Sequence, residues 1–520
     1  MSTRWNVLLI TADQWRADCL SAVGHPMMRT PNIDKLAGEG VLFRNHFTQC
    51  SPCGPSRTSL LTGMYAMNHR SLRNGTPLDA RFTNIALEMR KLGYDPALIG
   101  YTDTSLDPRE RPRADPALAT YAGTMPGFIQ QVPGSEGDDA WIADLREKGY
   151  KVGGTRDQAC APVPNYPDAG RRGPTYAPPC YPSKDSETAF NVDHAIRFVT
   201  HRPAPWFLHL SILQPHPPFI VSEPYNKMYD PAEVPAFRTL PTQEAEAAVH
   251  PYAAFMRKYF RDREGLDPKI HTEDELARRQ LRATYYGMMS EVDDNIGRLV
   301  AALKRIGKYD NTLIVFTTDH GEMLWDHWVL GKEFFYDQAF HIPLIVRIPG
   351  AAWDSTRGRR IEEFTGSIDL MPTILDLLGG EPPLQCDGCS LAPFLMGKNP
   401  GNWRREIFWE LDFRDPASDL PERELGVALD DCTIAVVRDA RYKYVQFAGG
   451  LPPVFFDLTD DPGELKNRAG DPAYTGRAFE MAQKMLAWRL SKAERMLTGI
   501  RLTKDGPVEC PRARRFPQVI

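Results

Sequence analysis

The chain has 520 residues, a formal net charge of −5 and 25% charged residues. This length favours one large domain with a smaller one, and the scattered lysines and arginines predict no basic face for nucleic acid. Nine cysteines are too few for a disulfide scaffold in a chain this long, and an odd number cannot pair completely.

The first apolar run, at 6–10, predicts a strand that ends close to Asp13 and Gln14. The run is too short for the apolar core of a signal peptide, and no segment is long and apolar enough to cross a bilayer. We therefore expect a soluble, cytoplasmic protein with no membrane partner.

The segment from 51 to 63, Ser-Pro-Cys-Gly-Pro-Ser-Arg-Thr-Ser-Leu-Leu-Thr-Gly, predicts a helix that begins at Cys53. Pro55 suits a first helical turn, because its missing N–H costs nothing there. One turn of helix places Cys53 and Arg57 on the same face. The unpaired N–H groups and positive dipole end of such a helix favour an anion beside Cys53. The segment therefore indicates an enzyme that acts on an anionic ester.

Two CxxC pairs occur, Cys50/Cys53 and Cys386/Cys389. The first is compatible with a redox or zinc pair, but a zinc site needs a second pair of ligands, and no matching pair lies nearby in the sequence. The second pair encloses Asp-Gly and is typical of a turn.

Later β-branched or leucine-rich runs predict four further strands, at 97–101, 206–212, 312–318 and 342–348. They alternate with helical patterns, of which the clearest runs from Leu281 to Leu303 and stops at Gly307. The apolar residues of that helix are expected to be core. The alternation predicts an α/β fold with a mostly parallel central sheet flanked by helices on both faces.

The region 153–184 is rich in Pro, Gly, Tyr and Arg and has no period, which is typical of a lid, an interface arm or a disordered insert. A Gly- and Pro-rich stretch at 375–400 predicts a boundary between a catalytic domain at 1–390 and a smaller domain at 391–520.

The smaller domain is expected to be α+β, with an antiparallel sheet and a helix at 474–497 whose apolar members are Phe479, Met485, Leu486 and Leu490. Its predicted strands are 433–437, 442–447 and 455–458. The tail carries Arg501, Lys504, Arg512, Arg514 and Arg515, and is either an arm for contacts between subunits or simply solvated.

Polar groups follow three of the predicted strands. Asp13 and Gln14 follow the first, Asp103 follows the second, and Asp319 and His320 follow another. Since ligands bind outside the carboxyl ends of the strands in open parallel sheets, these side chains are expected to converge. Oxygen and imidazole ligands of this kind suit Mn²⁺, Ca²⁺, Mg²⁺ or Zn²⁺. A capping Asp beside a His at a helix entry would be the plainer explanation of the Asp319-His320 pair.

Taken together, these motifs resemble the sulfatase branch of the alkaline-phosphatase superfamily. The matching segments follow in order along the chain: the first strand ending in Asp13, the Cys53-x-Pro55-x-Arg57 signature, Thr318-Asp319-His320-Gly321, Ser367 to Thr373, and Phe456-Asp457-Leu458. Within that branch the chain is similar to the phosphonate monoester hydrolases, which are cytoplasmic and act on phosphonate monoesters, phosphodiesters and aryl sulfates. The segments that carry this similarity are residues 7–18, 94–101, 215–219 and 442–445.

The resemblance implies that Cys53 is oxidised by a formylglycine-generating enzyme, and that the hydrated formylglycine attacks sulfur or phosphorus in line. It implies one divalent metal, with Mn²⁺ favoured, held by Asp13, Gln14, Asp319, His320 and the modified residue at position 53. Many sulfatases have a second aspartate where this chain has Gln14, and a neutral amide there should leave the metal more electrophilic.

The resemblance also assigns roles around the substrate. Arg57 would hold the formylglycine hydrate, and Asn74 would donate to the bound anion. Lys332 and His216 would bind non-bridging oxygens or protonate the leaving oxygen. Taken singly, the last three would be a turn Asn, a surface lysine and a loop histidine.

One departure from the phosphonate hydrolases concerns the segment Tyr101-Thr102-Asp103 at the substrate side. Those enzymes carry a small hydroxyl residue where this chain has Asp103. A carboxylate there would repel doubly charged phosphate monoesters more than singly charged esters, and it would attract a cationic leaving group. A dedicated arylsulfatase with weak phosphonate activity is therefore the main alternative.

Two further alternatives share the fold: a phosphotransferase or mutase, which the cysteine at position 53 disfavours, and a non-catalytic anion-binding protein that never receives the modification. The similar hydrolases are tetramers built as dimers of dimers, so a homo-oligomer is expected. The natural substrate is not determined by these motifs.

Overall fold

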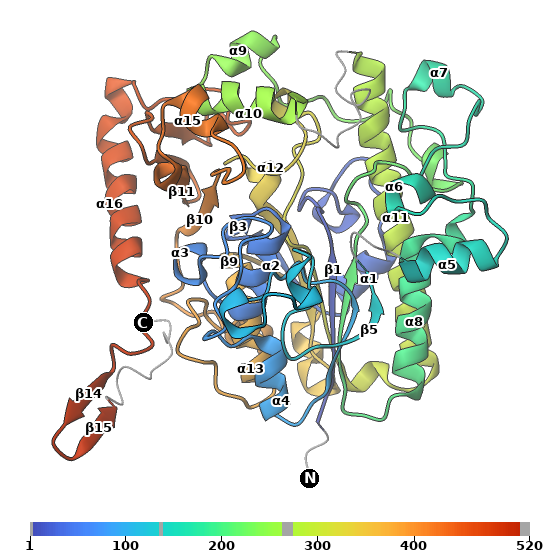
Figure 1. Ribbon diagram of the computed structural model, residues 1–520, viewed down its shortest axis with the longest axis horizontal. Coiled ribbons are helices and arrows are strands. Elements are labelled where there is room, and N and C mark those ends of the chain that lie inside the picture. Colours follow the sequence, from blue (N-terminus) through green and yellow to red (C-terminus); the bar gives the residue numbers. More distant parts are fainter. Residues whose placement is uncertain (1–3, 135–138, 263–273, 510–520) are drawn as a thin grey trace.

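The structure is a computed structural model that describes residues 4–134, 139–262 and 274–509. In these residues the central sheet has eight strands in the order β5-β4-β6-β1-β7-β8-β2-β9 (Figure 1). Their bounds are β1 (Asn6–Ala12), β2 (Val41–Phe47), β4 (Pro96–Gly100), β5 (Ile129–Pro133), β6 (Phe207–Ile212), β7 (Thr312–Thr317), β8 (His341–Arg347) and β9 (Arg359–Gly366). Only β8 runs antiparallel to its neighbours in this sheet. The predicted mostly parallel sheet is confirmed.

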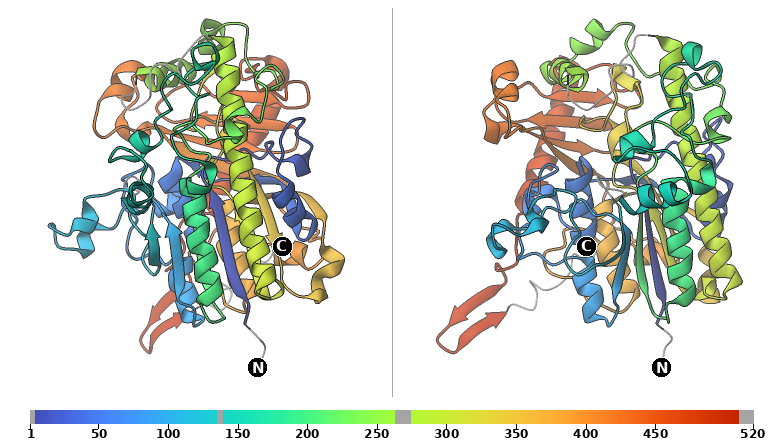
Figure 2. Two further views of the ribbon diagram at one scale, coloured as in Figure 1. Left: turned by 90° about the vertical axis from the view of Figure 1, so that its right-hand side faces the viewer. Right: turned by 45° about the vertical axis from the view of Figure 1, so that its right-hand side comes forward.

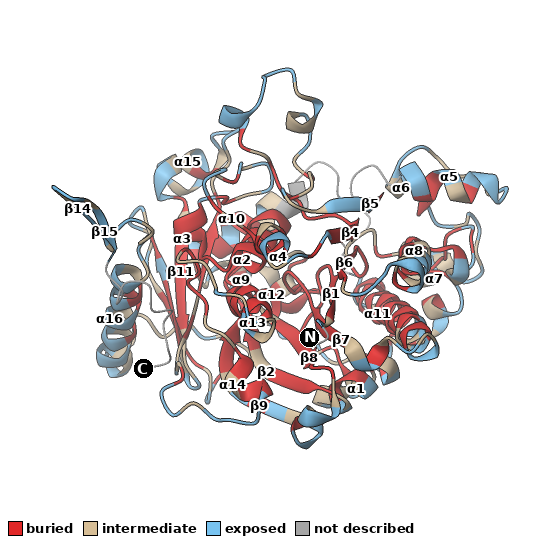
Figure 3. Cartoon of the chain, turned by 90° about the horizontal axis from the view of Figure 1, so that it is seen from below, coloured by how far each residue is buried: buried red, intermediate tan, exposed pale blue. Residues whose placement is uncertain are grey.

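Helices cover both faces of this sheet, because successive strand residues point to opposite sides. Leu8 and Ile10 of β1 pack into one core with α1 (Pro31–Gly38), α8 (Glu187–His201) and α11 (Glu275–Arg305). Val7 and Leu9 pack into the other core, whose helices are α2 (Cys53–Thr62), α4 (Ile85–Lys91), α13 (Leu370–Leu377) and α14 (Ala392–Leu395). Figure 2 shows α8 and α11 side by side, and Figure 3 shows the buried residues gathered along the strands.

A second sheet has the order β13-β12-β11-β10-β3. Its strands are β3 (Cys50–Ser51), β10 (Ile407–Asp412), β11 (Thr433–Arg438), β12 (Tyr442–Phe447) and β13 (Val454–Asp457). The antiparallel strands β11, β12 and β13 were predicted, but β10 and β3 were not. The two-residue strand β3 pairs in parallel with β10, and only Pro52 separates it from Cys53. The C-terminal sheet thus supports the segment that carries the candidate nucleophile.

Helix α16 (Thr475–Ser491) covers this second sheet with Met481, Met485 and Trp488. The predicted helix at 474–497 is therefore too long at its C-terminal end. Its other apolar members face away from the sheet: Phe479, Leu486 and Leu490 are 63%, 60% and 73% exposed.

The hairpin of β14 (Ile500–Thr503) and β15 (Gly506–Glu509) extends away from the body beyond α16 (Figure 1). Arg501 and Lys504 lie in it, whereas Arg512, Arg514 and Arg515 lie outside the described residues.

The region 153–184 is largely irregular, with the one-turn helices α6 (Arg156–Ala159) and α7 (Ala169–Arg172) and the start of a 3-10 helix at Ser183–Asp185. The remaining helices are α3 (Ala66–His69), α5 (Asp139–Glu147), α9 (Gln243–Ala247), α10 (Pro251–Asp262), α12 (Asp337–Phe340) and α15 (Leu420–Leu425). Among the described residues, no helix combines the length and apolar character that crossing a membrane requires.

Candidate active site

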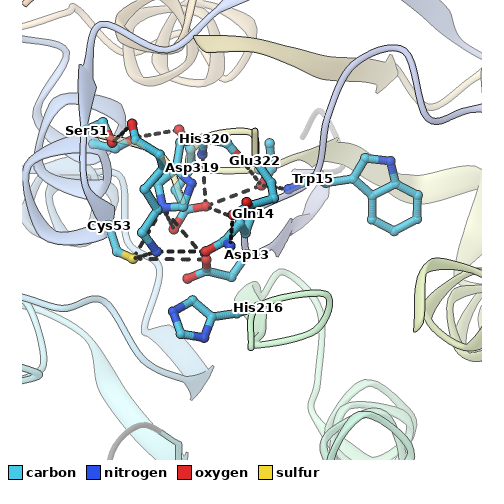
Figure 4. Close-up of polar contacts among 12 residues, drawn as sticks. Asp13, Gln14, Trp15, Ser51, Cys53, His216, Asp319, His320 and Glu322 are labelled. Carbon is cyan, nitrogen blue, oxygen red and sulfur yellow. Dashed lines mark hydrogen bonds and ion pairs between the residues drawn. The ribbon is translucent and has the colours of Figure 1, made fainter. Parts of the chain in front are cut away.

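The carboxyl ends of β1 and β7 place two acidic side chains next to each other. The strands are parallel neighbours with Thr11 opposite Thr317, and Asp13 and Asp319 each follow two residues later. Helix α2 begins at Cys53 beside them. One ligand atom from each of Asp13, Cys53, Asp319 and His320 can be chosen so that all four lie within 4.8 Å of one another (Figure 4).

Arg57 bridges the two carboxylates from the same helix face as Cys53. Its Nε donates to Asp319 Oδ2 and its Nη2 donates to Asp13 Oδ2, both over 2.9 Å. The guanidinium also lies over the ring of Tyr101, with its carbon 4.1 Å from the ring centroid. These contacts fix the separation of the two carboxylates, because each bond is charge-assisted and buried.

His320 is oriented so that one ring nitrogen faces Cys53. Its Nδ1 lies 3.0 Å from the Gly321 carbonyl oxygen, which only accepts hydrogen bonds, so Nδ1 carries the proton. The unprotonated Nε2 lies 3.2 Å from Cys53 Sγ. Burial lowers the pKa of His320 to about 3, so the ring is neutral. A neutral imidazole whose far nitrogen is held by a carbonyl is the usual form of a metal-ligating histidine.

The charges of the two carboxylates fit a cation between them. Burial alone would raise the pKa of Asp13, but the positive charges of His216 in its protonated form, of Lys332 and of Arg57 outweigh it and lower that pKa. The pKa of Asp319 is raised to about 7, chiefly by burial and then by the charge of Asp13. Two carboxylates in one buried site repel each other, so one tends to keep a proton. A divalent ion would relieve this repulsion, and the donor set suits one.

Gln14 lies between Lys332 and Glu322. Lys332 Nζ donates to Gln14 Oε1 over 2.8 Å and lies 3.0 Å from Cys53 Sγ. The amide nitrogen of Gln14 donates to Glu322, whose other oxygen accepts the main-chain N–H groups of Leu324 and Gly331. The structure thus brings Gln14 and Lys332 to the predicted site from distant parts of the chain.

Asn74 and His216 each have one polar atom that makes no hydrogen bond to the described residues. Asn74 Oδ1 accepts the N–H of Gly54 over 2.9 Å, which leaves its Nδ2 as a donor. His216 Nδ1 donates to the Pro217 carbonyl over 2.8 Å, so its Nε2 is unprotonated. Burial and then Lys332 lower the pKa of His216 to about 3. Figure 4 shows His216 facing Cys53 and Asp13.

Cys53 is a poor nucleophile as a thiol. Burial raises its pKa well above the usual range, and the charge of Asp13 raises it further. Thiolate, the nucleophilic form, is therefore scarce near neutrality. Cys50 does not join Cys53 in the ligand group; its Sγ lies 3.2 Å from Ser59 Oγ. The geometry gives no support to a paired CxxC metal site.

Several side chains of the site were not singled out from the sequence. Glu322 lies three residues after Asp319 and could have been found by extending that motif. Ser211, at the end of β6, accepts from Arg57 Nη1 over 2.7 Å. Arg73 and Glu333 form an ion pair of 3.0 Å that joins the segments of Asn74 and Lys332. The last two contacts have no sequence signal, because they depend on segments more than 150 residues apart.

Comparisons with known proteins agree with this geometry. The Sulfatase family profile matches residues 5–380, and the profile described as N-sulphoglucosamine sulphohydrolase, C-terminal, matches residues 325–491. The multifunctional alkaline phosphatase superfamily protein PehA of Trinickia caryophylli is 44% identical over 97% of this chain and 99% of its own. An arylsulfatase of Clostridium perfringens is 28% identical over 97% of this chain and 98% of its own.

A solved structure shows the same fold over the whole chain. The phosphonate monoester hydrolase of Agrobacterium radiobacter has a TM-score of 0.93 and 46% identity, covering 99% of this chain and 100% of its own. The Sulfatase profile spans well over half of the chain, which establishes that the chain is a member of this family. The chain belongs to the sulfatase family of the alkaline phosphatase superfamily and is a hydrolase of the sulfuric ester and phosphonate monoester class.

Proposed function

We propose that the protein is a metal- and formylglycine-dependent hydrolase of singly charged esters: aryl sulfates, phosphonate monoesters and phosphodiesters. The observation that carries the proposal is the buried group of Asp13, Cys53, Asp319 and His320. Arg57 forms ion pairs with both of its carboxylates, and Lys332 contacts Cys53. This arrangement places a modifiable cysteine among two carboxylates, a neutral imidazole and two cations. The relatives named phosphonate monoester hydrolase and arylsulfatase support the same chemistry.

The metal would be held by Asp13, Gln14, Asp319, His320 and the modified residue 53. Mn²⁺ is favoured, with Ca²⁺, Mg²⁺ or Zn²⁺ as alternatives. When bound, such an ion supplies Lewis-acid stabilisation of the substrate oxygens and lowers the pKa of a hydroxyl beside it.

The position of Cys53 suits an oxidised rather than a thiol side chain, since its raised pKa disfavours thiolate chemistry. A formylglycine-generating enzyme is the partner that the proposal requires. The hydrated formylglycine would provide the hydroxyl for in-line attack. Arg57, already fixed by two carboxylates, would orient that hydroxyl.

The remaining side chains would hold the anion and assist the leaving group. Lys332 Nζ and Asn74 Nδ2 both lie on the Cys53 side of the site and would donate to non-bridging oxygens. Lys332, whose ammonium group carries protons, or His216, once its Nε2 has taken up a proton from water, would protonate the leaving oxygen. Tyr101 donates to Asp13 Oδ2 over 2.5 Å and would line the substrate side together with Asp103.

The test compares kcat/KM for an aryl sulfate, an aryl phosphonate monoester, an aryl phosphodiester and an aryl phosphate monoester on one metal-reconstituted preparation. Cys53→Ala is the blank, and mass spectrometry of the peptide that contains residue 53 reports conversion to formylglycine. Turnover of the singly charged esters that vanishes in Cys53→Ala is the expected result. Turnover that survives in Cys53→Ala would contradict the proposal.

A dedicated arylsulfatase with weak phosphonate activity is the second candidate. It is favoured by the departure from the phosphonate monoester hydrolases at Asp103 and by relatives named arylsulfatase. In the same panel it would show an aryl sulfate preference of orders of magnitude over the phosphonate and the diester.

The protein is further proposed to be a homo-oligomer, built as a dimer of dimers. Support comes from the exposed apolar residues of α16 and from the hairpin of β14 and β15 beyond it. Exposed apolar residues gathered on one helix face are typical of contacts between subunits.

A further inference from the structure

Asp103 places a carboxylate in the part of the site that is proposed to bind the anionic ester. It follows β4, its side chain is buried, and it has a backbone φ of 47°. A methyl group at Gly54 would come within 3.1 Å of both the Asp103 carbonyl oxygen and Asn74 Oδ1. Asp103 therefore lies against the first turn of α2, next to Cys53 and on the same side as Asn74.

The carboxylate of Asp103 receives no hydrogen bond from the part of the chain that the structure describes. Its nearest cation is Arg57, whose Nε lies 3.9 Å from Oδ2, beyond hydrogen-bond distance. Buried carboxylates are normally hydrogen-bonded or closely paired. Asp103 has no hydrogen-bonded partner among the described residues, so its charge is available to whatever occupies the site.

Arg57 cannot donate a hydrogen bond to Asp103, because all of its N–H groups already donate to other acceptors. Its Nε donates to Asp319, its Nη2 donates to Asp13 and Tyr101, and its Nη1 donates to Ser211 Oγ and the Tyr101 carbonyl. Two carboxylates thus balance the single charge of Arg57 before Asp103 is considered. The negative charge of Asp103 is left to act on whatever anion occupies the site.

The effect of such a charge depends on the charge of the substrate. Coulomb repulsion from Asp103 is proportional to the substrate charge, so a doubly charged phosphate monoester is repelled twice as strongly as a singly charged sulfate, phosphonate monoester or diester. Burial keeps the interaction from being screened by salt. Arg57 and Lys332 attract both the singly and the doubly charged esters. Repulsion from Asp103 reduces the extra attraction that they give to the second negative charge of a phosphate monoester.

We propose that Asp103 is a specificity-determining residue that makes the site select singly charged esters against doubly charged phosphate monoesters. The inference rests on the proposed hydrolysis of anionic esters at position 53, and it names the residue that sets the accepted charge class. Asp103 would do so by like-charge repulsion rather than by a direct contact with the ester.

The kinetic test compares wild type with Asp103→Asn, which keeps the size of the side chain and tolerates a positive φ. Because burial raises the pKa of Asp103 to about 7, the assays run at pH about 8.5, where the carboxyl group and the phosphate monoester are both ionised. The ratio of kcat/KM for an aryl phosphonate monoester to that for an aryl phosphate monoester is expected to fall at least about fivefold in Asp103→Asn.

Two further variants support this test. Asp103→Glu keeps the charge and should keep most of the kcat/KM ratio. Asp103→Ser is used in place of Asp103→Asn if the Asn variant does not fold. Asp107→Asn is the matched control on the same segment, since Asp107 pairs with Arg109 over 2.5 Å and is outside the site. A fall of the ratio by less than about fivefold in Asp103→Asn, or an equal fall in Asp107→Asn, would overturn the proposal.

A binding measurement separates failure of this proposal from failure of the proposed function. The affinities of phenyl phosphate and phenyl sulfate are measured by calorimetry on Cys53→Ala protein with Mn²⁺, with and without Asp103→Asn. This needs no turnover, so it remains informative if the wild type hydrolyses none of the esters. Asp103→Asn should tighten phenyl phosphate at least about fivefold more than phenyl sulfate. Equal changes for the two ligands would contradict the role of Asp103.

Discussion

The orientation of the Gln14 amide follows from two neighbours of different kind. An ammonium group only donates and a carboxylate only accepts, so Lys332 selects the oxygen end of the amide and Glu322 selects the nitrogen end. The oxygen of Gln14 is therefore directed to the same region as the candidate metal ligands. Burial raises the pKa of Glu322 to about 7, and two main-chain N–H groups hold this side chain in place.

Glu322→Gln is expected to weaken metal binding by about tenfold without removing any proposed ligand, because the new amide can donate to Gln14 and no longer fixes its orientation. Calorimetric titration of metal-free protein with Mn²⁺ measures the affinity directly. Glu381→Gln, at an exposed glutamate, is the control. An unchanged affinity in Glu322→Gln would show that Gln14 does not depend on Glu322 for its orientation.

At the scale of elements, one ion pair joins two loops that each bring a side chain to the site. Arg73 precedes Asn74 and Glu333 follows Lys332, and Arg73 Nη2 lies 3.0 Å from Glu333 Oε2. Both side chains are largely buried. Arg73 also donates to the Asp412 carbonyl over 3.2 Å, at the end of β10. The pair thus ties two proposed anion-binding loops to each other and to the second sheet.

Arg73→Gln and Glu333→Gln should each lower kcat/KM by about tenfold, and the double variant should lose little more than either single variant. The reason is that either change already releases Asn74 and Lys332 from their common position. The measurement is a double-mutant cycle on the ester that the wild type hydrolyses best. The exposed pair Arg423 and Asp419 provides the control cycle. Additive losses in the Arg73 and Glu333 cycle would contradict a shared positioning role.

At the scale of the whole molecule, the C-terminal region presents apolar side chains to solvent. One face of α16 packs on the second sheet, and the other exposes Phe479, Leu486 and Leu490. The hairpin adds Leu502 and Val508, which are 79% and 54% exposed. Monomeric proteins rarely leave such a group uncovered. The division into domains at 1–390 and 391–520 stays a prediction, although β3 already crosses that boundary to join the second sheet.

Leu486→Glu and Leu490→Glu together should convert the proposed homo-oligomer into smaller species, because burying two charges in an apolar contact is strongly unfavourable. Sedimentation velocity at several protein concentrations measures the change. Ile129→Glu is the matched control, since Ile129 is an exposed apolar residue on β5 that is 44% exposed. An assembly that is unaffected by the double substitution would exclude this face of α16 from the interface.

Much of the fold and part of the site follow from short-range patterns. The strands β4, β6, β7 and β8 were predicted to within one residue at each end and β1 to within two, because buried strands of a parallel sheet are short apolar runs. The start of α2 at Cys53 was also predicted, because the proline and the polar residues that favour a helix start lie within one turn. By contrast, β3 is too short to show a period, and the face that α16 exposes depends on which side meets the second sheet.

The sequence by itself determined that Cys53 and Arg57 share a helix face and that acidic groups follow parallel strands, since both depend on the geometry of single elements. Only the tertiary structure decided which side chains surround them. The Gln14 partners and the pair of Arg73 and Glu333 join groups far apart in the chain, and the carboxylate of Asp103 accepts no hydrogen bond from the described residues. Such contacts depend on packing between elements, which no local pattern encodes.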